Sequence, residues 1–186
     1  MNAATIFDSR IRALHPPVGL PAIRPLCERF SCSPIVVVRP RSEGEWDRVR
    51  AFIRRMTKED LHLRFGHPID FNDEATMRRF FDIRPGTGEI AWVLDETSAI
   101  AGISHRIMVS PGEAEIGLIV RSDRKRRGIG ECLLRAMLAR SARQGLDTLS
   151  AVVLRENRAV LRLAAKIGYV QRAANAFTVE LIFALR

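Results

Sequence analysis

Apolar residues recur along the chain in two spacings, one typical of strands and one typical of helices. Short apolar runs bounded by turn-forming residues predict strands over residues 35–38, 89–95, 99–109, 114–120, 147–154 and 177–183. Apolar positions three and four residues apart predict helices over residues 45–56, 57–66, 72–83, 129–144 and 157–167. The segments follow one another in the order strand, helices, three strands, helix, strand, helix, strand.

The connections between these segments narrow the choice of fold. The short turns "ETS" and "SPGE" join the three central strands and so predict an antiparallel meander. Capping residues support the helices: Ser42 with Glu45 forms a capping-box pattern, Asn72 precedes the third helix, and Gly145 follows the fourth. We therefore expect an α+β fold, with α/β-like layering, in which helices flank one mixed sheet.

The first 34 residues differ in character from the remainder of the chain. They carry five prolines, which interrupt helices and strand ladders: Pro16, Pro17, Pro21, Pro25 and Pro34. The apolar residues between these prolines indicate that the segment packs against another surface. We therefore expect a Pro-rich N-terminal arm over residues 1–34 and one domain over residues 35–186.

Composition adds a strong positive charge to this picture. The formal net charge is +9 over 186 residues, and arginine supplies all the basic side chains except Lys58, Lys125 and Lys166. Such a balance favours anionic ligands in general, phosphates among them. Aromatic residues make up only 6% of the chain, so no stacking platform for single-stranded nucleic acid is evident. We therefore do not expect nucleic acid as a partner.

The sequence also bounds the setting in which the protein acts. No apolar run is long enough to span a bilayer and no signal-peptide pattern opens the chain, so we expect no membrane partner. The cysteines, Cys27, Cys32 and Cys132, are odd in number and lack the spacing of a metal site. We expect Cys132 to pack inside its helix as a small apolar residue. A reducing, cytoplasmic setting without a disulfide scaffold or a metal follows.

The stretch "VRSDRKRRGIGECLL", residues 120–134, is the strongest candidate for a ligand site. A run of cations and two glycines, Gly128 and Gly130, stand between an apolar strand and an apolar helix. The start of a helix attracts anions, and glycines let a ligand approach the backbone closely. A Walker-A loop is excluded because the chain lacks its Gly-Lys-Ser/Thr ending, and a dinucleotide fingerprint because Leu133 replaces its third glycine.

Three segments together resemble the GNAT superfamily of acetyl-CoA-dependent N-acetyltransferases. The strand "AEIGLIV" followed by "RSDRKRRGIG" is similar to the fourth strand and the Q/R-x-x-G-x-G/A pyrophosphate loop of that family. The apolar helix that follows and the segment "VVLRENRAVLRLAAKIGY" are similar to its next helix, fifth strand, Asn-started helix and closing Gly-aromatic pair. The resemblance covers residues 115–169 by motif and residues 35–112 by order of elements. It implies a mostly antiparallel sheet and acetyl-CoA as cosubstrate.

The resemblance also implies which residues hold acetyl-CoA. Backbone N–H groups of five consecutive residues would bind the pyrophosphate: Arg126, Arg127, Gly128, Ile129 and Gly130. The backbone of Leu118, Ile119 and Val120 would pair with the pantetheine arm like an added strand, and the Asn157 side chain would bond to the same arm. Lys125 stands where the family pattern has Gln or Arg, and it keeps the charge without the fork-shaped geometry of arginine.

In this family the acceptor amine attacks the thioester directly, so the resemblance implies a base rather than a nucleophilic cysteine. Glu115 is the first candidate, because it lies on the cosubstrate strand two residues before Gly117, which we expect to leave open space. Alternatively, Glu115 faces solvent or pairs with an arginine and has no catalytic role. His105 on the neighbouring strand is the second candidate. Ala164 occupies the position of the family's usual tyrosine acid, while Tyr169 is expected in the core.

The acceptor is the least determined part of the function. Residues 56–73, "MTKEDLHLRFGHPIDFND", resemble the corresponding stretch of bacterial protein lysine acetyltransferases of the Pat type. Those proteins also place an Ala-Glu pair on the cosubstrate strand, as Ala114 and Glu115 do here. We therefore expect acetyl transfer to a primary amine, with a protein lysine as one acceptor. A small-molecule amine acceptor and an acyl-CoA-binding sensor without turnover stay open as alternatives.

Overall fold

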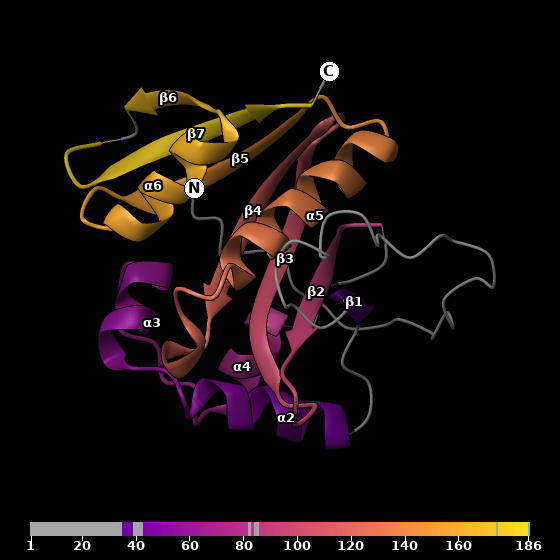
Figure 1. Cartoon of the computed structure of the whole chain (residues 1–186), viewed down its shortest axis with the longest axis vertical. Coiled ribbons are helices and arrows are strands. Elements are labelled where there is room, and N and C mark those ends of the chain that lie inside the picture. The colour runs from indigo at the N-terminus through magenta and orange to yellow at the C-terminus, as the bar shows by residue number, and fades with distance from the viewer. Residues whose placement is uncertain (1–34, 39–42, 82, 84–85, 174, 186) are drawn as a thin grey trace.

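The computed structural model describes residues 35–38, 43–81, 83, 86–173 and 175–185 (Figure 1). Seven strands form its sheet: β1 (Ile35–Val38), β2 (Gly88–Leu94), β3 (Ile100–Ser110), β4 (Glu113–Val120), β5 (Thr148–Leu154), β6 (Val170–Ala173) and β7 (Thr178–Ala184). The helical elements are α2 (Glu43–Ile53), α3 (Lys58–Phe65), α4 (Glu74–Phe81), the 3₁₀ turn η1 (Ser122–Arg124), α5 (Ile129–Arg143) and α6 (Arg158–Ile167).

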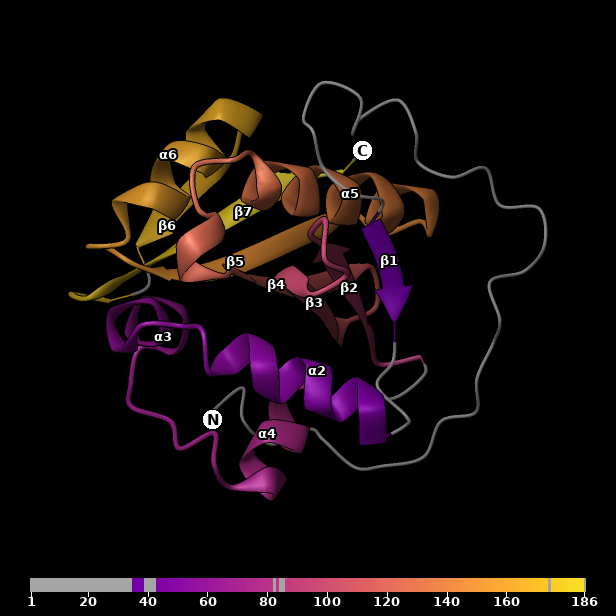
Figure 2. The ribbon, with the colours of Figure 1, turned by 60° about the horizontal axis from the view of Figure 1, so that its bottom comes forward.

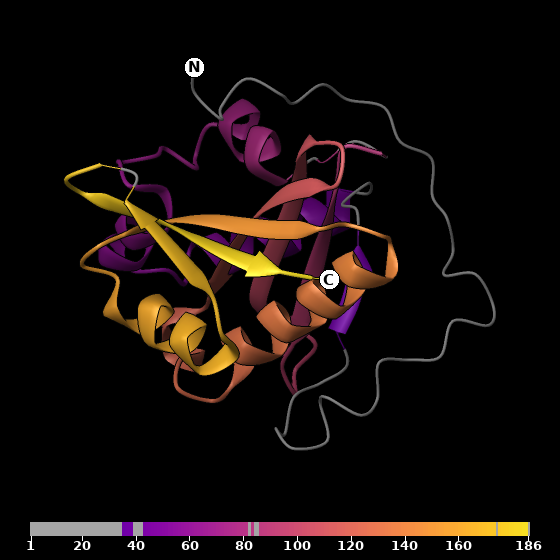
Figure 3. The ribbon, with the colours of Figure 1, turned by 90° about the horizontal axis from the view of Figure 1, so that it is seen from above.

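The strands form one sheet with the order β1-β2-β3-β4-β5-β7-β6. Neighbouring strands are antiparallel except β4 and β5, which are parallel and connected through α5. Figure 3 shows β5, β7 and β6, coloured orange to yellow, next to one another at one end of this strand order. The predicted α+β fold with a mixed, mostly antiparallel sheet is therefore confirmed.

The parallel pair of strands opens into a fork. Strands β4 and β5 pair at three positions, from Glu113 with Thr148 to Glu115 with Ser150. Both strands continue beyond Glu115 and Ser150 without pairing to each other. In Figure 1 the two strands lie side by side where they begin and separate toward their ends. The fork leaves the facing edges of both strands accessible to a ligand.

Helices cover both faces of the sheet, and each face has its own apolar core. Figure 2 shows α5 and α6 on one face and α2, α3 and α4 on the other. Side chains alternate along β4, so Ile116 belongs to the core under α5 and α6, and Ile119 to the core beside α2 and α4. Glu115 and Gly117 alternate in step with Ile119, so they face the layer that contains α3.

The structure shifts several predicted helix ends by a few residues, and two of these shifts have a clear local cause. Helix α2 ends at Ile53 rather than at Met56, because the N–H groups of Arg55 and Met56 bond three positions back, to the carbonyls of Phe52 at 3.1 Å and Ile53 at 2.9 Å. Helix α4 is capped by Asp73 rather than by Asn72, since the Asp73 carboxylate accepts from the Thr76 N–H at 2.9 Å. Asn and Asp are equally good caps, so their order in the sequence could not decide between them.

Strand β6 was not predicted, and its residues explain why. It is four residues long, and Val170 at its start is exposed, so no alternation of buried and exposed apolar residues marks it. Its pairing with β7 places it at the edge of the sheet. The predicted arm over residues 1–34 and the capping residue Ser42 lie outside the described residues. None of the helices that the structure describes is both long enough and apolar enough to cross a membrane.

Candidate active site

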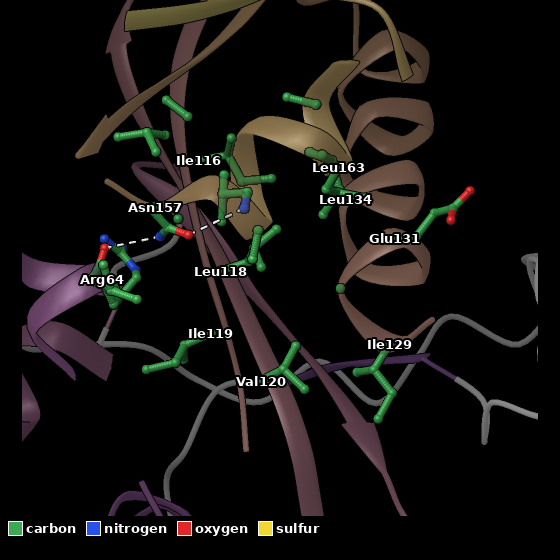
Figure 4. Close-up of a pocket in the computed structure, with 18 of the residues that line it drawn as sticks. Arg64, Ile116, Leu118, Ile119, Val120, Ile129, Glu131, Leu134, Asn157 and Leu163 are labelled. Carbon is green, nitrogen blue, oxygen red and sulfur yellow. Dashed lines mark hydrogen bonds between the residues drawn. The ribbon is translucent and has the colours of Figure 1, made fainter. Parts of the chain in front are cut away.

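A cavity of about 410 Å³ lies in the fork between β4 and β5 (Figure 4). Its walls come from α3 on one face of the sheet, from α5 and α6 on the other, and from the loop between β4 and α5. This volume is typical of small-molecule sites. The cavity is lined by nine of the predicted site residues: Leu118, Ile119, Val120, Lys125, Arg126, Gly128, Ile129, Gly130 and Asn157. Arg127 and Glu115 are not in its lining.

The loop before α5 has the backbone geometry that an anion site requires. Arg126 has a φ of 62° and Gly128 a φ of 79°, so the chain passes twice through the left-handed region. Gly128 has no side chain to cap α5, so the N–H groups of the first helical turn remain available to a ligand. A Cβ atom on Gly130 would lie 3.6 Å from Leu163 and Val120, an ordinary contact distance. Protein packing therefore does not require glycine at position 130.

Buried ion pairs hold this loop in place, and sequence reasoning missed them. Arg121, 1% exposed at the end of β4, donates to Asp95 in the β2–β3 turn at 2.7 Å, and Arg124 donates to the same carboxylate at 3.2 Å. Burial raises the pKa of Asp95, but hydrogen bonds from Thr97 and Arg121 outweigh it and hold this pKa well below its usual range. Part of the basic run thus anchors the loop rather than binding a ligand.

Lys125 has a partner that the family pattern does not predict. Its ammonium group pairs with the carboxylate of Asp60 on α3, a side chain that is only 8% exposed. Burial raises the Asp60 pKa, but hydrogen bonds from Lys125 and Ser122 outweigh it, so the pKa lies below its ordinary value. Lys125 therefore ties α3 to the loop. A contact with the cosubstrate, as expected from the sequence, would require Lys125 to serve two anions.

Asn157 joins two walls of the cavity at the start of α6. Its side-chain oxygen accepts from the Val160 N–H at 3.2 Å and so caps the helix. Its side-chain nitrogen donates to the Leu63 carbonyl of α3, also at 3.2 Å, and Figure 4 shows both bonds. The structure gives this residue a capping and bridging role. Its predicted bond to the pantetheine arm stays a prediction.

Glu115 occupies the last paired position of the fork, between Ile107 of β3 and Ser150 of β5. It is half-buried, and it makes no hydrogen bond or ion pair with any residue that the structure describes. Burial raises the pKa of Glu115, the Arg64 charge opposes this rise, and Glu180 adds to it. A half-buried carboxylate with a raised pKa beside a cavity has the properties of a general base.

Arg64 of α3 fills the space beside Gly117 that the sequence led us to expect open. A Cβ atom on Gly117 would overlap the Arg64 guanidinium group. The same group lies 2.7 Å from Nε2 of His105, which is the cross-strand partner of Gly117 on β3. Figure 4 shows Arg64 at the α3 wall of the cavity. The expectation of open space is wrong, because the glycine makes room for this arginine.

The contact with Arg64 weakens His105 as a candidate base. Arginine carries only donors, so Nε2 of His105 accepts the hydrogen bond and the ring proton lies on Nδ1. Burial and the Arg64 charge lower the His105 pKa well below its usual value. Burial also lowers the pKa of Arg64, to about 10, which leaves the guanidinium charged at neutral pH. Between the two candidate bases, this contact favours Glu115. Arg64 is one of the cavity residues that sequence reasoning missed.

The remaining candidates are part of the packed structure. Tyr169, the single tyrosine of the chain, packs its ring 6.4 Å from the ring of Phe183, and Ala164 is fully buried in the cavity wall. Cys132 is buried in α5, as expected of a packing residue. Within the described ranges, no group of three or more His, Cys, Asp or Glu side chains could hold a metal ion. Because Tyr169 does not line the cavity, no tyrosine is placed there to act as the acid.

Comparison with known proteins supports the sequence resemblance. The family described as "Acetyltransferase (GNAT) domain" matches residues 36–170. The acetyltransferase Pat of Mycolicibacterium smegmatis is 26% identical over a match that covers 68% of this chain and 42% of that protein. The chain thus corresponds to less than half of the length of this relative.

Solved structures show the same architecture. The GNAT domain of S. lividans PAT has a TM-score of 0.71 and 18% identity, covering 81% of this chain and 89% of that one. A GNAT superfamily phosphinothricin acetyltransferase from Sinorhizobium meliloti, in complex with AcCoA, has a TM-score of 0.65 and 14% identity, covering 81% of this chain and 88% of that one. At these identities the likeness shows the fold alone.

Proposed function

Because the chain belongs to the GNAT acetyltransferase family of acetyl-CoA-dependent N-acetyltransferases, we propose that it acetylates a primary amine and that Glu115 accepts the proton of this amine. The observation that carries the proposal is the position of Glu115 at the branch point of β4 and β5, beside the cavity. Its pKa, raised by burial, gives it the basicity that proton transfer needs.

Acetyl-CoA is proposed to lie along the fork. The N–H groups of residues 126–130 bind its pyrophosphate, which the left-handed backbone and the uncapped start of α5 support. The free edge of β4 at Leu118, Ile119 and Val120 pairs with the pantetheine arm, as an added strand would. Asn157 uses one N–H of its amide for Leu63, and the second can donate to the same arm.

The proposed reaction joins the amine nitrogen to the acetyl carbonyl carbon and breaks the carbon–sulfur bond of the thioester. The amine attacks only when neutral, and a lysine-like amine has a pKa of about 10.4, so a base is needed at neutral pH. Glu115 takes the amine proton, either directly or through one water molecule. Coenzyme A leaves as a thiolate and takes a proton from solvent, because no tyrosine reaches the cavity from the described residues.

A protein lysine is the acceptor that we propose. The resemblance of residues 56–73 to the Pat type and the similarity to the Mycolicibacterium smegmatis Pat support it. A cytoplasmic setting is part of the same proposal, and it rests on the cysteine count. A small amine as acceptor, or acyl-CoA binding without turnover, would each give a different result in the experiment below.

The test compares Glu115→Gln with Glu113→Gln, a change of the same kind at an exposed position of the same strand. Removing a general base costs ~100-fold or more in rate, so we expect such a loss of turnover for Glu115→Gln alone. Calorimetric titration should show the same acetyl-CoA affinity for both variants and the wild type, because neither side chain lines the cavity.

A pH–rate profile shows whether the turnover rate rises with pH, as a general base requires. Only the carboxylate form accepts a proton, so the wild-type rate should rise as pH passes through the raised pKa of Glu115. The variant should recover activity only as pH approaches the pKa of the amine, at about 10.4. Wild-type turnover by Glu115→Gln at neutral pH contradicts the assignment. Binding without turnover of any lysine peptide or small amine supports the sensor instead.

A further inference from the structure

Arg64 is a cation of the cavity wall that forms no ion pair in the described structure, although the charge of Glu115 acts on it from a longer distance. Several other buried or half-buried cations of the described structure pair with carboxylates, among them Arg121 with Asp95 at 2.7 Å and Arg106 with Glu89 at 3.4 Å. Arg64 instead contacts a neutral His105 ring at 2.7 Å and packs its guanidinium carbon 5.0 Å from the centre of the Phe65 ring. Among the described residues, no carboxylate forms an ion pair with it.

The position of this cation relates it to the proposed reaction. The guanidinium lies against Gly117, two residues from Glu115 on the same face of β4. The loop that binds the pyrophosphate in our proposal follows the other end of β4, after Val120. An anion held by Arg64 therefore lies near the thioester and the attacking amine, not near the pyrophosphate.

A largely desolvated charge that forms no ion pair is costly, and Glu115 compensates the Arg64 charge only from a distance. A bound carboxylate compensates one guanidinium charge and matches its planar pair of donors. A phosphate dianion would place excess negative charge beside Glu115, whose field already acts on Arg64. The chemistry around Arg64 therefore suits a single carboxylate better than a phosphate group.

We propose that Arg64 binds a carboxylate carried by one of the two substrates, close to the reacting atoms. The inference rests on the proposed function, since it places the acyl transfer at the Glu115 end of the fork. Two sources share this chemistry, and each replaces one substrate of the proposed pair, acetyl-CoA and a protein lysine. One is an amino acid acceptor, whose carboxylate neighbours its amine, and the other is a dicarboxylic acyl-CoA donor, whose free carboxylate extends past the thioester carbonyl. In both cases the bond changes and the proton transfer are those of the proposed reaction.

The test uses substrate pairs that differ in one carboxylate. The acceptor pair is leucine and leucinamide with acetyl-CoA, and the donor pair is succinyl-CoA and acetyl-CoA with leucinamide. A charge-assisted, bidentate contact should favour the carboxylate member of one pair by ~10-fold or more in kcat/KM. The pair that shows the preference identifies the source. Rates are compared at the plateau of each pH profile, because loss of Arg64 also raises the pKa of Glu115.

Three variants separate a charge effect from a packing effect. Arg64→Met removes the charge and should abolish the preference. Arg64→Lys keeps the charge but loses the planar pair of N–H donors, so it should retain only part of the preference. Lys58→Met removes an exposed cation from the same helix and should leave the preference unchanged. A preference that survives in Arg64→Met, or none in the wild type for either pair, overturns the inference.

Calorimetry of ligand binding distinguishes this failure from failure of the proposed function. Succinyl-CoA against acetyl-CoA, and leucine against leucinamide with coenzyme A bound, should show the same ~10-fold preference in the wild type and none in Arg64→Met. If binding shows an Arg64-dependent preference but no amine is turned over, the carboxylate site is supported and the proposed acetyltransferase mechanism is contradicted. Turnover without any carboxylate preference keeps the mechanism and removes the site.

Discussion

Two glycines at the start of α5, its cap Gly128 and its second residue Gly130, lack side chains for different reasons. Gly128 has a φ of 79°, where residues with a side chain are strained, so the backbone itself favours glycine. Gly130 lies inside helix α5, and a Cβ there meets Leu163 and Val120 at 3.6 Å, so the fold accepts a methyl group. Because Gly130 lines the cavity, we ascribe its missing side chain to the ligand.

Substitutions at Gly130 should therefore separate binding from stability. Gly130→Glu places a carboxylate where the pyrophosphate is proposed to bind, and we expect acetyl-CoA affinity to fall ~10-fold or more, or about 1.4 kcal/mol. Gly130→Ala should raise the free energy of unfolding by ~0.5–1 kcal/mol, because alanine is the better helix former, without improving affinity. Calorimetric titration and urea unfolding measure the two effects. A folded Gly130→Glu variant with wild-type affinity contradicts the proposed pyrophosphate site.

At the scale of elements, the β2–β3 turn fixes the loop that follows β4. The Asp95 side chain in this turn is 3% exposed and holds both Arg121 and Arg124. Asp95→Asn leaves these cations without their partner, so we expect a loss of ~3 kcal/mol or more in the free energy of unfolding at neutral pH. Glu96→Gln, at the next and exposed position, removes only a surface ion pair with Arg124 and should cost less than ~1 kcal/mol.

Urea unfolding as a function of pH tests whether the stability lost in Asp95→Asn comes from the carboxylate charge. The folded-state pKa of Asp95 is depressed, so its stabilising contribution is present above the unfolded-state pKa, about 3.9, and is lost as the pH falls through the folded-state pKa. The gap between the wild type and Asp95→Asn should therefore narrow as the solution becomes strongly acidic. A gap that is equal at neutral and acidic pH would show that the carboxylate charge is not the cause.

The sequence predicted elements wherever local residues determine them, and failed where the cause is distant. The strand and the glycines around the loop follow from alternation and from backbone preference, so residues 114–130 were placed correctly. Edge strand β6, with its exposed Val170, carries no such pattern. Arg64 meets His105 across 41 positions of sequence, and no local spacing indicates that contact. The anchoring of Arg121 by Asp95 across 26 positions was hidden for the same reason.

At the scale of the whole molecule, the net charge of +9 needs a separate test. We expect the charge to serve the cosubstrate and an acidic acceptor rather than nucleic acid, since the described site is a cavity in a fork and not an extended basic surface. Binding to duplex DNA should be weak and should fall steeply between ~50 and ~200 mM salt. Fluorescence anisotropy with two unrelated duplexes measures this. Sequence-selective binding that persists at physiological salt contradicts the expectation.

The open fork makes the donor a structural component as well as a reactant. Past Glu115, β4 has no strand on its β5 side, so a ligand that adds a strand there binds the folded chain and not the unfolded one. Such a ligand stabilises the fold by about 2.7 kcal/mol when its free concentration is 100 times its dissociation constant. We therefore expect the unfolded share of the protein, which is the share exposed to proteolysis, to fall ~100-fold at that donor concentration.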